Sequence, residues 1–339
     1  MENIISALST FQRSSAARSI WQLANTLIPY AVLWVLVYYA LDISYWLALP
    51  IIVLASGFTI RSFIIFHDCG HQSFFRSRKA NDFWGRITGV LTFTPYYYWN
   101  ANHARHHATS SNLDKRGAGD VWMMTYEEFI NATPKEQRQY RLYRHPLIMF
   151  FLGPLFMTLI SHRLVRRKAS RKEKLSIYGT NLSILIVGVA MSLIVGWKAY
   201  LIIQCSILYF ALIFGIWLFY VQHQFEDVYW SRTNGWNFIT ASLEGGSFYK
   251  LPAVLRWFTG SIGYHHVHHL NSKIPNYYLA KCHDEFQELN SIKPVDFWGS
   301  LKALNYRLHD EETGKMIGFR EAKELQMSRS QRVREAVSQ

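Results

Sequence analysis

Three short segments of the chain contain histidines at spacings suited to binding metal ions. They are His67-Asp-Cys-Gly-His71, His103-Ala-Arg-His106-His107 and His265-His266-Val-His268-His269. Histidines three or four residues apart lie on one face of a helix, so each segment can direct its imidazoles toward a common point. Neutral imidazole is a good ligand for iron, zinc, copper and nickel. The three segments contain nine histidines. Without His266 they provide eight imidazoles, which are too many for one ion and suit two.

Two histidines need separate treatment, one outside the three segments and one within the third. His223 follows a long apolar segment, with Glu226 and Asp227 beside it, and we expect it to be a ninth ligand. His266 would project about 100° away from His265 on a helix, so it is left out of the ligand set. The remaining histidines are isolated and are interpreted as ordinary polar residues: His145, His162, His283 and His309.

The ligand types favour iron over a structural zinc site. The three cysteines, Cys69, Cys205 and Cys282, are scattered and form no pair at a metal-site spacing. Nine imidazoles without cysteine suit a redox pair of irons, although zinc can replace ferrous iron in such a site. Carboxylates near the histidines are candidates to orient the ring nitrogens, and they are Asp68, Asp114, Asp120, Glu226, Asp227 and Glu244.

Long apolar segments predict the elements that must position these histidines. One runs from about 27 to 66 with a break at 41–44, and a second runs from about 177 to 221 with a break at 196–198. About 20 helical residues cross the hydrocarbon core of a bilayer, so each segment fits a helical hairpin. The predicted fold is an all-α integral membrane protein with a cytoplasmic helical cap that carries the histidines. Its four transmembrane helices are predicted at about 25–41, 45–66, 177–195 and 199–221.

The rest of the chain is expected to lie outside the bilayer core. Two shorter apolar segments, at about 83–98 and 146–160, are expected to form helices near the membrane surface. Residues 1–24 are expected to be a cytoplasmic N-terminal segment and residues 25–308 a single membrane domain. Residues 309–339 mix Glu, Lys and Arg and are expected to be a charged, solvated cytoplasmic tail.

The distribution of positive charge predicts the orientation in the membrane. The formal net charge is +13, and outside the predicted helices 34 Lys and Arg lie on the side of the termini and the middle loop, against Lys198 alone in the hairpin turns. The positive-inside rule therefore places both termini, the middle loop and the histidine segments in the cytoplasm. A nucleic-acid partner is not expected, because the cations flank apolar segments and are not interleaved with stacking aromatics.

A metal pair beside a membrane suggests a lipid substrate. Attack of activated dioxygen on an unactivated C–H bond requires a cofactor, and a membrane enzyme can draw an apolar chain from the bilayer. Moving that chain by one methylene changes binding by only about 1–3 kcal/mol, so positional choice needs a tunnel end wall or a head-group contact. The same histidine spacing also fits a hydroxylase, so hydroxylation of the lipid is an alternative reaction. A non-catalytic metal-binding protein or transporter is disfavoured, since the spans contain almost no ionisable residue except Arg61.

The three motifs, HDCGH at 67–71, HARHH at 103–107 and HHVHH at 265–269, resemble those of the membrane fatty acid desaturase family. With the four spans, the resemblance covers about residues 25–310. Four longer stretches are similar to the Bacillus-type acyl-lipid desaturases within that family, and they are residues 66–75, 106–115, 217–223 and 263–270.

This resemblance implies an oxygen-dependent, non-haem di-iron enzyme that inserts a cis double bond, at delta-5 in the Bacillus type, into acyl chains of membrane phospholipids. The chain lacks the His-Pro-Gly-Gly haem motif of members with a fused cytochrome domain, since its only His-Pro is His145-Pro146. Electrons are therefore expected from a separate carrier such as ferredoxin or flavodoxin. The resemblance assigns the iron ligands by position to His67, His71, His103, His106, His107, His223, His265, His268 and His269.

Overall fold

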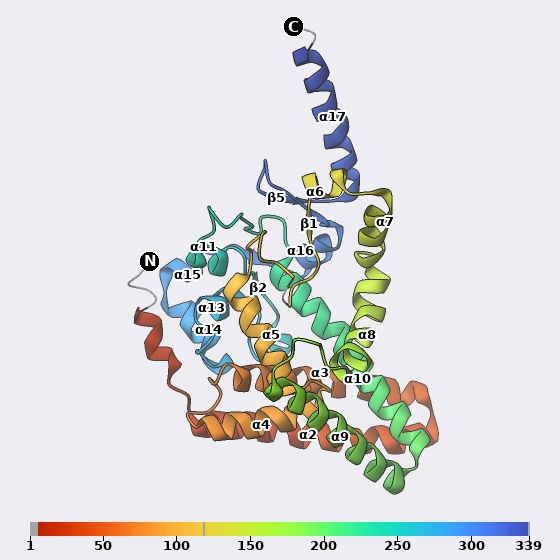
Figure 1. Cartoon of the computed structure of the whole chain (residues 1–339). Coiled ribbons are helices and arrows are strands. Elements are labelled where there is room, and N and C mark those ends of the chain that lie inside the picture. Colours follow the sequence, from red (N-terminus) through yellow and green to blue (C-terminus); the bar gives the residue numbers. More distant parts are fainter. Residues whose placement is uncertain (1–5, 118, 338–339) are drawn as a thin grey trace.

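The computed structural model describes residues 6–117 and 119–337 and is mostly helical. Within these residues, four helices are long and apolar enough to cross a membrane. They form two hairpins that turn at Ser44 and Gly196 (Figure 1), which confirms the predicted fold class. Their bounds are Ala16–Ile43 (α2), Tyr45–Gly70 (α3), Arg171–Val195 (α9) and Trp197–His223 (α10).

The four helices are longer than the predicted spans because hydropathy marks only the part that suits hydrocarbon. Their ends are set by capping residues. The Ser15 side chain accepts a hydrogen bond from the backbone of Arg18, and Ser170 forms a capping box with Glu173. Gly196 has a φ of 83° and separates α9 from α10. At their C-terminal ends, α3 and α10 extend past the predicted spans and carry His67 and His223.

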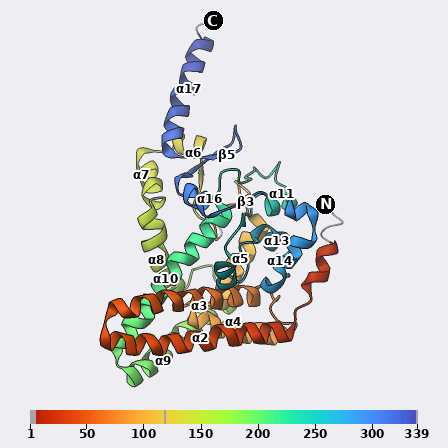
Figure 2. The same cartoon turned by 180° about the vertical axis from the view of Figure 1, so that it is seen from behind.

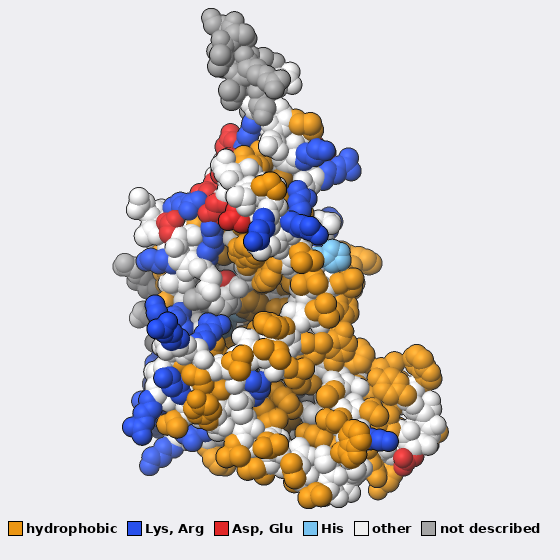
Figure 3. Space-filling model, turned by 45° about the vertical axis from the view of Figure 1, so that its right-hand side comes forward, with side chains coloured by type: hydrophobic (Ala, Val, Ile, Leu, Met, Phe, Trp, Pro, Cys, Tyr) orange, Lys and Arg blue, Asp and Glu red, His pale blue; other side chains and the backbone are white. Residues whose placement is uncertain are grey.

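The hairpins pack against each other through apolar side chains and expose the rest of their apolar surface. A cluster of buried residues from α2, α3 and α10 includes Val37, Ile52 and Ile203. By contrast, few residues of α9 are buried. Figures 2 and 3 show the hairpins and the broad hydrophobic surface that covers this part of the molecule. This surface suits contact with lipid.

The segment between the two hairpins differs from the predicted single helix at 83–98. The structure has two helices there, which end and begin around Pro95, the N-cap of the second. The proline ring disfavours helical backbone angles at the residue before it, so the chain turns at this point. The segment 146–160 forms η2 and α8. The helix Pro134–Tyr143 and the helical stretch Leu147–Arg163 meet at an angle of 59°, and together they are apolar enough to form a broken span or a re-entrant loop. The elements are Arg78–Leu91 (α4), Tyr96–Thr109 (α5), Tyr126–Asn131 (α6), Pro134–Tyr143 (α7), Leu147–Leu152 (η2), Gly153–Leu159 (α8) and Ser161–Arg163 (η3).

The part of the chain after α10 forms short helices on the same side of the α2–α3 hairpin as α5 (Figures 1 and 2). They place the third histidine segment over the C-terminal end of α3. A further 3-10 helix, η1, spans Ser9–Gln12 near the N-terminus. The elements after α10 are Phe238–Leu243 (α11), Ala253–Phe258 (α12), His265–Leu270 (α13), Asn276–Glu285 (α14), Gln287–Asn290 (α15), Phe297–Lys302 (α16), Ala303–Asn305 (η4) and Phe319–Val337 (α17).

Residues 308–310 and 316–317 are buried in a small sheet, with an exposed turn at 311–315 between them, so the start of the segment expected to be a solvated tail packs against the body. Strand β4 (Leu308–Asp310) pairs with β1 (Met124–Thr125) in parallel and with β5 (Lys315–Ile317) in antiparallel orientation. A second small sheet pairs β2 (Phe248–Tyr249) with β3 (Pro294–Val295). Pairing with a distant strand buries His309 and Asp310, and charge composition does not reveal such a contact. Helix α17 alone extends away from the body (Figure 1).

Candidate metal centre

Four helices bring the nine candidate histidines together. Helix α3 carries His67 and ends at its C-cap His71, and α10 ends at His223. Helices α5 and α13 each supply three of the remaining residues. The ligand atoms form two groups, and within each group they all lie within 4.8 Å of one another. The five-histidine group is His67, His71, His103, His107 and His268, and the four-histidine group is His106, His223, His265 and His269.

The division into two groups follows from helix geometry. Neighbouring residues on a helix point about 100° apart, so His106 and His107 enter different groups, as do His268 and His269. Helix α3 contributes only to the five-histidine group and α10 only to the four-histidine group. Helices α5 and α13 therefore contribute to both groups and set their relative position.

The four-histidine group has nitrogen lone pairs that face each other. His106 Nδ1 lies 2.5 Å from the Asp120 carboxylate, and His223 Nδ1 lies 3.2 Å from the Gly245 carbonyl oxygen. Both partners accept hydrogen bonds, so each neutral ring carries its hydrogen on Nδ1 and a lone pair on Nε2. The two Nε2 atoms are 3.1 Å apart. Two lone pairs at this distance repel unless a cation lies between them, so these residues fit a metal ion.

The five-histidine group shows the same pattern. His67 Nδ1 lies 3.1 Å from Asp68 Oδ1, which leaves its Nε2 free to bind a metal. The Nε2 atom of His107 is 3.1 Å from that of His103 and 3.0 Å from that of His268. Buried His71 Nε2 has no hydrogen-bond partner, although buried polar atoms rarely lack one. A metal ion would satisfy these convergent nitrogens.

Only two of the six candidate carboxylates contact these rings. Asp68 and Asp120 provide one carboxylate for each group. The other four are directed elsewhere, since proximity in sequence to a histidine does not ensure proximity in space. Asp114 pairs with Arg232, Asp227 lies 3.8 Å from Lys293, and Glu226 and Glu244 are exposed. Gly245 contacts His223, and Asn276 contacts Asp68. Neither residue was predicted, because no sequence motif marks it.

The histidines left out of the ligand set also lie outside both groups in the described part of the chain. His266 Nε2 is 3.0 Å from His283 Nδ1, so the surplus histidine of the third segment has a separate partner. His162 and His309 are buried away from the groups, and His145 lies before η2. Of the four histidines interpreted as isolated, His283 therefore has a histidine partner in the structure.

Burial favours the neutral form of six rings in the two groups. Desolvation, together with neighbouring imidazoles, holds the pKa of six histidines well below the usual value of 6.5, and they are His71, His103, His107, His265, His268 and His269. Neutral rings offer lone pairs to a metal. Aromatic side chains cover the centre on the side of the spans: Trp99 stacks on His103 at 4.2 Å between centroids, and Phe219 lies 5.2 Å from His223.

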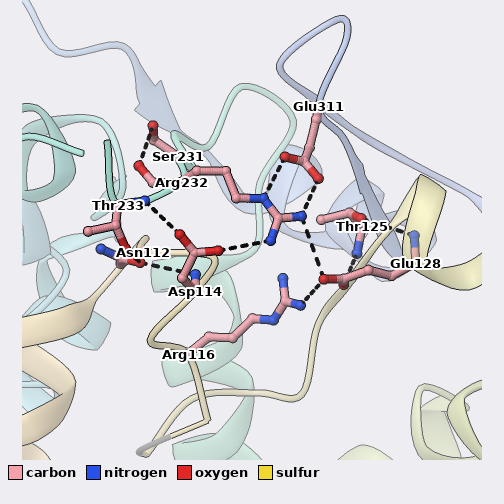
Figure 4. A network of polar contacts seen from close by, with 9 residues as sticks. All are labelled: Asn112, Asp114, Arg116, Thr125, Glu128, Ser231, Arg232, Thr233 and Glu311. Carbon is pink, nitrogen blue, oxygen red and sulfur yellow. Dashed lines mark hydrogen bonds and ion pairs between the residues drawn. The ribbon is translucent and has the colours of Figure 1, made fainter. Parts of the chain in front are cut away.

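A network of ion pairs anchors the loop that carries Asp120 (Figure 4). Arg232 donates hydrogen bonds to Asp114 at 2.9 Å and to both carboxylate oxygens of Glu311 at 2.6 and 2.9 Å. It also lies 3.7 Å from Glu128, which pairs with Arg116. The network thus joins the loop after α5 to the β4–β5 hairpin. Hydrogen bonds from the Thr233 backbone and from Arg232 lower the pKa of Asp114 to about 2.

We expect the substitution R232Q to lower enzymatic activity several-fold. Loss of the shared cation leaves Asp114, Glu128 and Glu311 to repel one another, which loosens the loop that positions Asp120. Because the network is partly exposed, salt screens that repulsion. Activity of R232Q should therefore recover in part as the salt concentration rises in a detergent assay. The substitution R320Q, in an exposed pair on α17, is the matched control and should leave activity unchanged.

The chain is similar in sequence to known fatty acid desaturases. Residues 44–293 match the family model described as fatty acid desaturase. The chain is 47% identical over 321 residues to a fatty acid desaturase of Bacillus subtilis (strain 168), which covers 95% of this chain and 91% of the relative. It is 26% identical to the sn-1 acyl-lipid omega-3 desaturase (ferredoxin) of Synechocystis, over 74% of this chain and 68% of the relative. It is 27% identical to the sn-1 oleoyl-lipid 12-desaturase of the same organism, over 80% and 76%.

The family match covers all three histidine segments and includes three of the four apolar helices almost entirely. The two histidine groups and the apolar helices thus occur in a chain whose relatives act on fatty acyl chains. The chain belongs to the fatty acid desaturase family and is an oxidoreductase of the membrane.

Proposed function

We propose that this desaturase inserts a cis double bond, at delta-5, into saturated acyl chains of membrane phospholipids. The observation that carries the proposal is the pair of histidine groups, with lone pairs that converge beside Trp99 of α5 and Phe219 of the membrane helix α10. The delta-5 position rests on the similarity to Bacillus-type enzymes. Relatives named for acyl-lipid substrates support an esterified chain as the substrate.

We infer that each group holds one iron ion, with the nine histidines as ligands. Iron bound there would supply the activation of dioxygen that side chains cannot provide. Over a full cycle the acyl chain loses two hydrogen atoms, two electrons and two protons arrive, and dioxygen becomes two water molecules. The protein's own part is to hold neutral imidazoles in place through Asp68 and Asp120 and to exclude water with Trp99 and Phe219.

The proposed site is cytoplasmic, together with both termini. His67 and His223 lie at the C-terminal ends of α3 and α10, away from the hairpin turns at Ser44 and Gly196. The Lys and Arg side chains that Figure 3 shows lie mostly outside the broad hydrophobic surface. Their excess on the side of the histidines supports this orientation by the positive-inside rule.

Locating the double bond in lipids of an expressing strain tests the proposed function. The host should lack the product, grow with aeration and contain a suitable electron donor. We expect a new monounsaturated chain with a cis bond at carbon 5 in phospholipids, identified by mass spectrometry after derivatisation. A chain heavier by one oxygen atom would instead identify a hydroxylase. The absence of any new chain from an expressed and iron-loaded protein would contradict the proposal.

An external electron carrier such as ferredoxin or flavodoxin is proposed to dock on the basic cytoplasmic side. Docking between an acidic carrier and a basic surface is steered by charge. With the carrier limiting, turnover should therefore fall several-fold as the salt concentration rises from low to physiological values. With the carrier saturating, the effect should be much smaller. A turnover that does not depend on salt when the carrier is limiting would exclude electrostatic docking.

A further inference from the structure

The carboxylate that orients His67 is itself held by one asparagine. Asp68 Oδ1 faces His67, and Asp68 Oδ2 accepts hydrogen bonds from the Asn276 backbone at 2.6 Å and from Asn276 Nδ2 at 2.9 Å. All three residues are nearly fully buried, with exposed fractions of 4% or less. Asn276 is the first residue of α14, more than 200 positions after Asp68, so this contact joins two distant parts of the chain.

The first membrane helix fixes the orientation of that asparagine. Gln22 of α2 donates from Nε2 to Asn276 Oδ1 at 3.0 Å. Because the oxygen of the Asn276 amide accepts this hydrogen bond, its NH₂ group must point to the other side, toward Asp68. Gly260, with a positive φ of 52°, leaves room for the amide, since a Cβ there would lie 3.1 Å from Asn276 Oδ1. Helix α2 provides no candidate ligand, yet it is connected to the centre through these side chains.

The two histidine groups differ in how their carboxylates are held. Asp68 belongs to a buried chain of contacts between two membrane helices and α14. Asp120 lies on a loop, where, among the described residues, its Oδ2 accepts a hydrogen bond only from the backbone of Gly117. A substitution at Asn276 therefore acts on His67 of the five-histidine group and has no direct route to His106 of the four-histidine group.

We propose that Asn276 is a positioning residue that sets the metal affinity of the five-histidine group alone, through Asp68 and His67. The inference rests on the proposed ligand set. Partners that orient a ligating histidine typically change metal affinity or activity 10- to 100-fold when they are removed. Asn276 removes the rotational freedom of Asp68, and Gln22 removes that of Asn276, so the effect should decrease from Asp68 to Asn276 to Gln22.

The test measures release of iron from the full chain in detergent with a chromophoric iron chelator. Wild type should release two ions per chain. In N276L, which removes the amide and keeps a side chain of similar size, one ion should leave about 10- to 100-fold faster while the rate for the other is unchanged. D68N should accelerate release of the same ion at least as much, Q22L should do so less, and D120N should accelerate the other ion.

A double-mutant cycle identifies the route. If Asn276 acts through Asp68, the combination of N276L with D68N should release iron no faster than D68N alone, whereas N276L and D120N should affect the two ions independently.

The control is N81L, which removes a buried asparagine bonded to the backbone of Phe75. It should lower thermal stability and leave both release rates unchanged. Equal acceleration of both ions in N276L, or rates like those of wild type, would overturn the inference. A wild-type protein that binds fewer than two ions would instead refute the proposed ligand set.

Discussion

Replacement of His223 by alanine should reduce desaturation at least 100-fold and lower the iron content from two ions per chain to one. His223 is one of four imidazoles in its group, and its Nε2 lies 3.1 Å from that of His106 and 2.9 Å from that of His265. Loss of a hydrogen-bond partner of a ligand already costs 10- to 100-fold, so loss of the ligand itself should cost more. Elemental analysis of the purified protein and lipid analysis of expressing cells measure the two effects.

The matched control is His162, a histidine of similar burial that lies outside both groups. Its exposed fraction is 9%, against 6% for His223. H162A should retain two irons and most of the activity, although it is expected to melt at a lower temperature because it leaves a cavity. If H223A also retained two irons, His223 would not be a ligand, and the four-histidine group would have to be abandoned.

Much of this architecture could be predicted from the sequence because it depends on local patterns. The lengths of the apolar segments predicted four spans. The breaks at residues 41–44 and 196–198 coincide with the turns at Ser44 and Gly196. Histidine spacing on a helix indicated which imidazoles share a face. It also excluded His266, which pairs with His283 in the structure. These inferences need only the geometry of one helix.

Features that depend on distant contacts could not be predicted. Helix geometry separates adjacent histidines such as His106 and His107, but which histidines of different segments meet in one group depends on the relative rotation of α5 and α13, which no single segment encodes. Asp114 was expected to orient a histidine ring, but in the structure it pairs with Arg232. This contact could not be predicted, because Arg232 lies 118 positions away in sequence. Likewise Asn276 appears in sequence as an ordinary residue after Pro275, and only the fold places it against Asp68.

Acidification should release both metal ions between about pH 6.5 and pH 5. In the folded chain, burial holds the pKa of six of the nine histidines below the value of about 6.5 that they have when exposed. The neutral, convergent rings therefore contribute stability and metal affinity above pH 6.5. Below that pH, protons bind better to states in which the rings are free, so both contributions are lost as the pH falls.

With the proposed ligand set the release should be steep, because the departure of an ion frees four or five imidazoles and allows several protons to bind. We expect iron retained after dialysis to fall with a slope of at least about two protons per ion, with a parallel decrease in the melting temperature. The Arg232 network should not contribute in this range, since the pKa of Asp114 is about 2 and its ion pair persists. Retention of both ions at pH 5, or a slope of one proton or less, would show that the ions are not held by clusters of imidazoles.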